Sequence, residues 1–393
     1  MHTILYPAIG LYHAGAEQQL YALVRGLDKR RFRPIVAPLY PGGVLAESFR
    51  ATPGVEVIDL NRRGKFDYAP LWRVAALLRA RRVDLVQPFL TPATFFGLLP
   101  AWLVGTPVKV VTERCGVRHE RQFGHRLYQH SEDWLTRFAD AVVPNSRAGR
   151  ESLLARGIPD EKIRVIYNGV NPERLQVDPA ARAAHRERLG VPAGGQVVGI
   201  LASLTEAKDH ATFLRAAALV SVRRPDVRYA IVGGGPVQAE LEALAAGLGL
   251  ADRVVFCGYQ RQVASCLAAW DLLVSASRDN EGLSNSILEA MALGVPVVAT
   301  AIGGTPELVE DGVTGALTAA GDPAALAAAI EAALADPAAA RARAARARQL
   351  VESRFSLERM VADYEGLYER LLEAKERAAV PSLAVRGADR GKR

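Results

Sequence analysis

Short apolar segments alternate along the chain with longer segments whose apolar residues recur at helical spacing. Apolar strands are expected at 3–6, 34–38, 55–60, 85–89, 108–112, 141–144 and 163–167 in the first half. The second half repeats the pattern at 197–204, 228–232, 254–258, 270–277 and 295–300. Apolar strands that alternate with helices are typical of stacked βαβ units. We therefore expect an α/β protein with parallel sheets.

The 393 residues exceed one ordinary domain and suit two, each of roughly 150 to 200 residues. We expect a first α/β domain over 1–171, a linker over 172–193 with three prolines, and a second α/β domain over 194–355. A helix over 356–378 carries an apolar stripe that must be buried, either on the chain itself or in a dimer seam. The basic tail 379–393 is expected to be disordered.

Several sequence features argue against a membrane span, a signal segment, disulfides and a zinc site. The most apolar stretch, 88–104, is interrupted by Pro92 and Pro100, which favours a buried helix over a membrane span. No signal-like segment opens the sequence. The three cysteines have no C-x-x-C spacing, so neither disulfides nor zinc are indicated. We expect a cytoplasmic protein.

Positive charge is concentrated in the first half. Residues 1–170 hold 24 Lys and Arg against 15 Asp and Glu, and the remainder holds 25 against 27. The basic residues form clusters at 25–33, 62–65 and 79–82. Such clusters suit reversible contact with an anionic membrane or a pyrophosphate-bearing lipid acceptor, although arginine used for solubility explains any single cluster slightly better. Nucleic acid is disfavoured because no recognisable motif interleaves the clusters with stacking aromatics.

The most informative segment for chemistry is 280–292. Glu281 falls in a loop after an apolar strand, and Glu289 falls inside the following helix, for which Ser284 is a candidate N-cap. A helix start after a strand directs N–H groups towards a phosphate, while a carboxylate deeper in the helix suits a ribose diol. The alternative is a solvated loop glutamate and a helix-surface ion pair.

The sequence Glu-Gly-Leu-Ser-Asn-Ser-Ile-Leu-Glu-Ala-Met-Ala at 281–292 closely resembles the E-x7-E signature of glycosyltransferase family four. The resemblance extends to Ala14-Gly15-Ala16-Glu17, where the family usually has G-G-x-E, and to Asn168-Gly169-Val170-Asn171 before the linker. It implies a GT-B fold, with two Rossmann-like domains facing across a cleft and the C-terminal helix crossing back to the first. It also implies retaining transfer of a sugar from a nucleotide-diphosphate sugar, with the acceptor on the first domain.

The resemblance assigns roles to individual residues. Lys208 holds the lysine position of the family's R-x4-K pair and would face the diphosphate, whereas Ser203 stands where the arginine is common. Glu281 would orient the donor sugar and Glu289 would hold the ribose. The remaining donor contacts are expected at Gly15, Ser203, Gly282, Leu283 and Ser284. Arg114 and His119 are candidates for contact with the sugar or acceptor: relatives often place a histidine beside the donor sugar, Arg114 holds that position here, and His119 is nearby in the sequence.

Three functional classes stay open on the sequence alone. The first is a retaining glycosyltransferase that builds a cell-envelope polysaccharide, glycolipid or lipid-linked product. The second is a nucleotide-sugar epimerase or hydrolase on the same scaffold. The third is a catalytically silent binding module, which the loss of arginine at Ser203 makes conceivable. Asp279 and Glu281 form a D-x-E, but we expect no metal and no cofactor, because a lysine and a helix N-terminus already supply positive potential.

Overall fold

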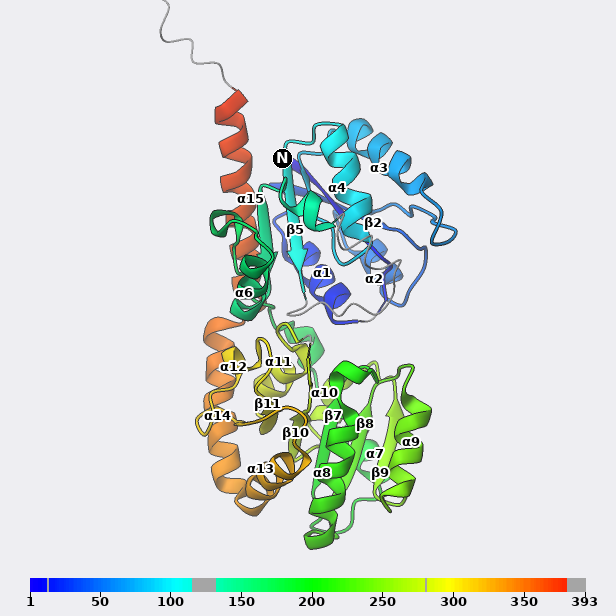
Figure 1. Ribbon diagram of the computed structural model, residues 1–393, viewed down its shortest axis with the longest axis vertical. Helices are drawn as coiled ribbons and strands as arrows, with labels where there is room; N and C mark the ends of the chain where they lie inside the picture. Colours follow the sequence, from blue (N-terminus) through cyan, green and yellow to red (C-terminus); the bar gives the residue numbers. More distant parts are fainter. Residues whose placement is uncertain (13, 115–131, 280, 380–393) are drawn as a thin grey trace, which may run out of the picture. The chain divides into compact units, whose positions relative to one another are not determined.

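The computed structural model describes residues 1–12, 14–114, 132–279 and 281–379, and the chain forms two compact units (Figure 1). The first unit comprises Met1–Thr112, Phe123–Val142 and Val361–Arg393; the second comprises Glu113–Gln122 and Val143–Met360. The domain boundaries expected from the sequence stay predictions. Of the expected tail 379–393, all but residue 379 lies outside the described residues.

The first sheet is a six-stranded sheet of the order β3-β2-β1-β4-β5-β6. Its strands are β1 (His2–Ala8), β2 (Phe32–Pro38), β3 (Glu56–Val57), β4 (Leu85–Val86), β5 (Val108–Glu113) and β6 (Ala141–Pro144). The helices α1 (Gly15–Gly26), α2 (Ala46–Ala51), α3 (Ala69–Ala80) and α4 (Ala93–Leu103) connect them. β1 pairs in parallel with both β2 and β4, so the sheet extends from β1 on both sides. This is the doubly wound order of a Rossmann-like domain.

The last helix, α15 (Leu357–Ala379), belongs to the first unit from Val361 onward. Its apolar stripe is buried, and its fully buried Tyr368 donates a hydrogen bond to Gln87 Oε1 at 2.5 Å and accepts one from Tyr6 at 3.1 Å. Glu365 accepts from the backbone N–H of Asp28 at 2.7 Å. Because buried hydroxyls and amides need partners, this network fixes α15 against β1 and β4.

The second sheet has the order β12-β11-β10-β7-β8-β9, the same doubly wound arrangement. Its strands are β7 (Val197–Leu201), β8 (Arg228–Val232), β9 (Val254–Gly258), β10 (Leu272–Ser275), β11 (Val297–Thr300) and β12 (Ala316–Thr318). The unit's helices are α6 (Arg147–Ala155), η1 (Asp160–Lys162), η2 (Pro172–Leu175), α7 (Pro179–Arg188), η3 (Glu206–Lys208), α8 (His210–Arg223), α9 (Gln238–Gly247), α10 (Val263–Leu267), α11 (Asn285–Ala292), α12 (Thr305–Leu308), α13 (Pro323–Ala335) and α14 (Pro337–Arg354). β7 pairs with β8 on one side and β10 on the other. The strand order therefore reverses between β7 and β10, where ligands usually bind in such sheets.

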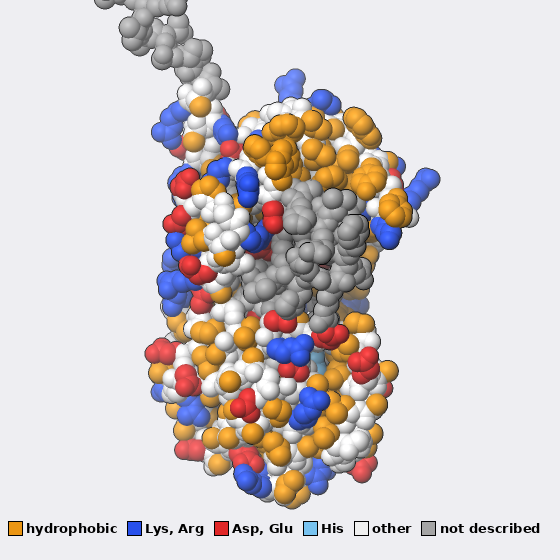
Figure 2. All heavy atoms as spheres, viewed as in Figure 1, with side chains coloured by type: hydrophobic (Ala, Val, Ile, Leu, Met, Phe, Trp, Pro, Cys, Tyr) orange, Lys and Arg blue, Asp and Glu red, His pale blue; other side chains and the backbone are white. Residues whose placement is uncertain are grey.

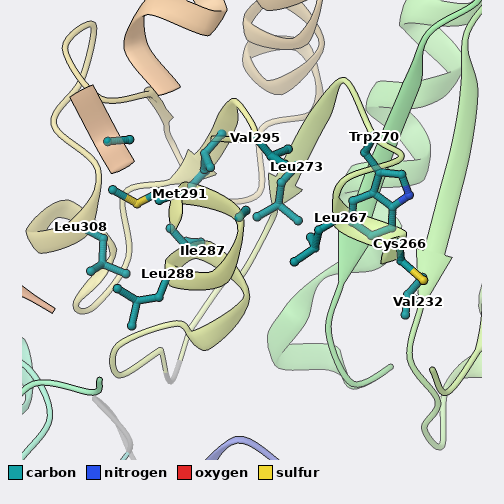
Figure 3. Packing of buried hydrophobic residues seen from close by; sticks show 14 of the residues in the cluster. Val232, Cys266, Leu267, Trp270, Leu273, Ile287, Leu288, Met291, Val295 and Leu308 are labelled. Atoms are coloured by element: carbon teal, nitrogen blue, oxygen red, sulfur yellow. The ribbon is translucent and has the colours of Figure 1, made fainter. Parts of the chain in front are cut away.

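A continuous apolar core supports that reversal point (Figure 3). Figure 3 shows Ile287, Leu288 and Met291 of α11 grouped with Leu308, and each of these side chains is at most 1% exposed. Burial of side chains of this size typically contributes about 1.5 to 3 kcal/mol each. α11 is therefore held firmly against the sheet, with its N-terminus at the reversal point.

The fold class expected from the sequence is confirmed, with local differences. The strand expected at 163–167 does not form, because Ile163 alone in this range is a β-bridge residue and 164–167 pair with no strand. β12 was missed because it has only three residues. The helix expected within 88–104 starts at Ala93, and its last two residues are exposed rather than buried.

No single helix among the described residues is long and apolar enough to cross a membrane. The pair α13 and α14, bent by 100° at their junction, passes the length and composition test only when taken together.

Candidate functional site

Lys208 is presented by a short turn that follows β7. The turn is the 3-10 helix η3, and Asp209 ends it with a left-handed backbone, φ +42°. The Asp209 carboxylate then accepts hydrogen bonds from the Thr212 N–H at 3.1 Å and the Thr212 hydroxyl at 2.8 Å, which caps α8. The turn thus places Lys208 at the carboxyl end of β7.

Glu281 lies in the loop after β10 and meets Lys208 there. The Lys208 Nζ is 2.5 Å from Glu281 Oε2, and the Ser277 hydroxyl donates to the same oxygen at 2.6 Å. The Glu281 side chain is 7% exposed and that of Lys208 26%. A buried carboxylate needs such partners, because an unpaired buried charge is costly. Two neighbouring strands therefore bring one cation and one anion together at the reversal point.

Backbone contacts fix the loops that carry this pair. The Arg278 N–H donates to the Ala207 carbonyl at 2.9 Å, which joins the loop after β10 to the Lys208 turn. The Gly304 N–H donates to the Gly282 carbonyl at 3.1 Å. A Cβ at Gly303 would collide with the Glu281 carbonyl, so this glycine, at φ +54°, permits the close approach.

Residues that precede β7 in the chain also contact Gly282 and Leu283. A Cβ at Gly282 would stand 2.5 Å from the Arg114 carbonyl oxygen and 2.6 Å from Asn145 Oδ1, so no larger residue fits without movement. The buried Asn168 amide donates to the Leu283 carbonyl at 3.0 Å and to Asn285 Oδ1 at 2.9 Å. Its own Oδ1 accepts from Arg114 Nη1 at 2.5 Å. Asn168 thus links Arg114 to the loop that enters α11.

Ser284 occupies the predicted N-cap position of α11, which begins at Asn285. Its hydroxyl makes no cap hydrogen bond and lies 3.1 Å from the Ser286 hydroxyl instead. Glu289, 7% exposed, lies inside α11 as predicted. Its Oε1 accepts a hydrogen bond from Arg174 Nε at 2.6 Å, and Arg174 belongs to η2. Glu289 is therefore buried and forms an ion pair with Arg174, whose side chain is 20% exposed.

The remaining predicted residues are distributed as follows. Ser203 is exposed in the loop after β7, upstream of Lys208. Gly15 belongs to the first unit, where it is the first residue of α1. His119 lies outside the described residues. The functional roles assigned to all of these residues stay predictions.

His210, next to the Lys208 turn, is 1% exposed, and neither of its ring nitrogens has a hydrogen-bond partner. Burial, reinforced by the Lys208 charge, lowers the pKa of His210 to about 4. The imidazole is therefore neutral at pH 7, and among the described side chains at this turn the positive charge comes from Lys208.

Sequence reasoning missed three residues that support the site: Ser277, Asn168 and Arg174. Asn168 was interpreted only as part of an Asn-Gly turn, and Arg174 only as part of a linker. The available signal was weak, because each acts through a hydrogen bond to a residue 4 to 117 positions away.

The described residues contain no group of three or more His, Cys, Asp or Glu placed to hold a metal ion.

Comparison with known proteins gives this arrangement its context. A family model described as glycosyl transferases group 1 matches residues 195–336, and one described as glycosyltransferase family 4 matches residues 13–174. A GDP-mannose-dependent alpha-(1-6)-phosphatidylinositol monomannoside mannosyltransferase of Mycolicibacterium smegmatis is 37% identical over 341 residues, covering 82% of this chain and 86% of the relative. A 2-deoxystreptamine glucosyltransferase of Streptomyces kanamyceticus is 31% identical over 325 residues, covering 78% and 84%.

The similarity extends to solved structures. HepE of Anabaena, solved in complex with UDP-glucose, is 27% identical, with a TM-score of 0.82 over 94% of this chain and 100% of that one. Sucrose-phosphate synthase of Thermosynechococcus elongatus shares the fold with a TM-score of 0.75 at 22% identity, covering 95% and 100%. The chain therefore belongs to glycosyltransferase family 4, and its two Rossmann-like units are those of the GT-B fold.

Proposed function

We propose that this glycosyltransferase moves a sugar, with retention of anomeric configuration, from a nucleotide-diphosphate sugar to a cell-envelope polysaccharide, glycolipid or lipid-linked acceptor. The observation that carries the proposal is the Lys208–Glu281 pair at 2.5 Å, placed where the strand order of the second sheet reverses. A cation suits a diphosphate, and an adjacent carboxylate suits sugar hydroxyls.

Each residue has a distinct task in this proposal. Lys208 and the N-terminus of α11 stabilise the negative charge that grows on the diphosphate as the glycosidic bond breaks. Glu281 accepts hydrogen bonds from the donor sugar and orients it, and Glu289 accepts from the ribose. The acceptor oxygen bonds to the anomeric carbon on the face that the phosphate leaves, and the departing phosphate oxygen takes the acceptor proton.

We propose that Arg278 compensates for Ser203, which stands where the family commonly has arginine. Arg278 is exposed, and its backbone N–H is bonded to Ala207, the residue before Lys208. Arg114, an alternative source of positive charge in the second unit, already donates to Asn168. A guanidinium at Arg278 can therefore reach a diphosphate held at the Lys208 turn without breaking a described contact.

The donor and acceptor classes rest on relatives and charge. HepE was solved with UDP-glucose, and the Mycolicibacterium relative is named for GDP-mannose and a phosphatidylinositol mannoside. Both donors carry a diphosphate linked to a nucleoside, and a diphosphate is the group that the Lys208 turn suits. The basic first half supports an anionic or lipid-linked acceptor met at the inner face of a membrane.

We propose no metal requirement, because Lys208 and the α11 dipole supply positive potential at the diphosphate. Transfer should then persist at full rate after dialysis against a chelator. Loss of transfer that Mg²⁺ or Mn²⁺ restores would show that the enzyme needs a metal ion.

The direct test is a thermal-shift screen of UDP, GDP, ADP and TDP and their sugars, followed by mass spectrometry of products with candidate acceptors. Transfer should require both a nucleotide-sugar and an acceptor. NMR of the product should show the anomeric configuration of the donor. Epimerised or hydrolysed donor without transfer would instead establish an epimerase or hydrolase, and binding without any reaction would establish a silent module.

A further inference from the structure

An unusual group of exposed hydrophobic side chains lies on the first unit (Figure 2). Figure 2 shows hydrophobic side chains gathered over α3 and α4, on the face in view. We call this surface the aromatic face and define it by six exposed residues: Phe66 (77% exposed), Trp72 (78%), Trp102 (46%), Leu103 (64%), Trp134 (49%) and Phe138 (45%). Single exposed apolar residues are ordinary, but a group that contains three tryptophans is not.

Contacts between neighbouring rings and the packing of α4 hold the aromatic face together. The ring centroids of Trp102 and Trp134 are 6.1 Å apart, and those of Trp134 and Phe138 are 4.8 Å apart, both with edge-on geometry. α4 packs against α3, and every α4 residue that is not buried is apolar, namely Phe95, Leu99, Trp102 and Leu103. A helix exposed to water normally turns polar residues outward. The outward side of α4 is therefore suited to an apolar environment.

Basic residues border the aromatic face. Residues 61–83 hold seven Lys and Arg against a single acid, Asp67. Arg63 and Arg79 are exposed there, and Lys65 Nζ lies 5.1 Å from the Phe66 ring centroid. Cationic side chains beside exposed aromatic rings are the composition of a surface that sits at the interface between lipid headgroups and acyl chains.

The basic cluster at 25–33 lies elsewhere on the first unit, and its charges are mostly paired. Lys29 donates to the carbonyls of Val24, Arg25 and Leu27. Arg30 pairs with Asp28, Arg31 with Glu365 and Glu369, and Arg33 with Glu56. Carboxylates and carbonyls thus engage most of this cluster. In the border, Arg62, Arg73 and Arg81 are engaged in the same way, but no such contact is described for the exposed side chains of Arg63 and Arg79, which are therefore the better candidates for meeting an anionic surface.

We infer that the aromatic face docks on an anionic lipid bilayer, with Trp72, Trp102 and Leu103 entering the headgroup region and Arg63 and Arg79 meeting lipid phosphates. This inference rests on the proposed function, because a lipid-linked acceptor would be held at the same bilayer surface. The contact is peripheral and reversible, since a few aromatic side chains and clustered arginines hold a protein less firmly than a spanning helix.

The charges favour a bilayer over other occupants. A symmetric dimer through this face would bring two basic borders close together, and like charges across an interface disfavour association. A single-stranded nucleic acid can stack on aromatic rings, but it gains little from the aliphatic Leu103 and Leu99. An anionic bilayer satisfies both the apolar centre and the basic border.

Tryptophan fluorescence provides a direct readout. Three of the chain's four tryptophans lie on the aromatic face, and the fourth, Trp270, is 4% exposed in the second unit. Adding phosphatidylglycerol vesicles at low salt should shift the emission to the blue, and lipids brominated near the headgroup should quench it. Phosphatidylcholine vesicles, or phosphatidylglycerol vesicles at high salt, should have much less effect.

Matched variants locate the contact. Trp72→Ser with Leu103→Ser should lower partitioning onto phosphatidylglycerol vesicles at least tenfold, and Arg63→Gln with Arg79→Gln should lower it by about fivefold for each charge removed. Val222→Ser, which is 84% exposed on α8, and Arg341→Gln, exposed on α14, should leave partitioning unchanged. Circular dichroism and calorimetric nucleoside-diphosphate binding would show that every variant is folded.

The outcomes separate this inference from the proposed function. Failure of the wild-type enzyme to bind anionic vesicles, with intact nucleotide binding and transfer to a soluble acceptor, would overturn the docking surface alone. Equal vesicle binding by the aromatic-face and control variants would also overturn it. Concentration-dependent dimerisation or binding to single-stranded oligonucleotides, lost specifically in the aromatic-face variants and without vesicle binding, would assign the face to those partners instead.

Discussion

Lys208 and Glu281 form an ion pair in which the ammonium lies 2.5 Å from a carboxylate oxygen that also accepts from Ser277. A donor diphosphate placed at this turn would draw on the same ammonium. Glu281 would then keep the hydrogen bond from the Ser277 hydroxyl and accept further hydrogen bonds from the donor sugar. The pair therefore holds both side chains in place before the donor arrives, which reduces the ordering that binding requires.

The two glutamates should have separable effects. Glu289→Ala should weaken binding of the bare nucleoside diphosphate, because a ribose contact exists whatever the sugar does. Glu281→Ala should chiefly lower kcat, because it removes an orienting contact to the sugar. Calorimetric titration with the nucleoside diphosphate, alongside steady-state kinetics, distinguishes the two. Wild-type nucleotide affinity in Glu289→Ala would refute the ribose assignment.

Ser277 should act through Glu281. Ser277→Ala removes one of the two hydrogen bonds to Glu281 Oε2, and a hydrogen bond to a charged group is worth about 1.5 to 3 kcal/mol. We expect kcat to fall by about tenfold or more with a small change in the donor KM, and Ser277→Thr to restore part of the rate. The exposed Ser353→Ala is the matched control. An equal loss in the alanine and threonine variants would mean that the hydroxyl does not position Glu281.

Arg278 and an arginine introduced at position 203 should be able to replace one another as the source of positive charge. Arg278→Ala should lower the transfer rate by roughly 100-fold, the usual cost of losing a donor to a developing negative charge. Adding Ser203→Arg to that variant should restore much of the rate, whereas Ser203→Arg alone should be neutral or stimulating. The comparison is a double-mutant cycle on the rate of transfer. No rescue in the double variant would leave the compensating group elsewhere.

Protein stability should fall on mild acidification because two buried histidines resist protonation. Burial lowers the pKa values of His185 and His210 from 6.5 to about 4. Between those values the unfolded chain binds more protons, so stability is full above about pH 6.5 and is lost as the pH falls towards 4. His210→Phe should flatten the pH dependence of unfolding by up to about 1.4 kcal/mol per pH unit. Urea unfolding at pH 7.5, 6 and 5 measures this, and an unchanged slope in the variant would contradict it.

Much of the fold was predictable because local patterns determine it. β6, β8 and β9 begin and end where the apolar runs indicate, and Ser146, which directly precedes α6, caps that helix through the Gly149 N–H at 3.0 Å. The expected strand at 163–167 failed because an apolar run becomes a strand only where the sheet offers a partner edge. Tertiary pairing, which one sequence does not display, decided that case.

The candidate site was predictable only in part. The positions of Glu281 and Glu289 in loop and helix follow from periodicity, but their partners do not. Arg174, 115 positions before Glu289, and Asn168, 115 before Leu283, reach the site through folding alone. The same holds for the aromatic face, since an apolar α4 predicts burial until the structure shows which side is exposed.

The central claim is that Lys208 binds the donor diphosphate, and calorimetry of Lys208→Ala with ligands that differ only in phosphates tests it most directly. The matched ligands are a nucleoside diphosphate and its nucleoside, with Arg341→Ala as the control variant and thermal unfolding to confirm the fold. We expect Lys208→Ala to lose most of the affinity that the diphosphate adds while nucleoside affinity stays at the wild-type value. Unchanged diphosphate affinity in Lys208→Ala, or an equal loss for both ligands, would contradict the account.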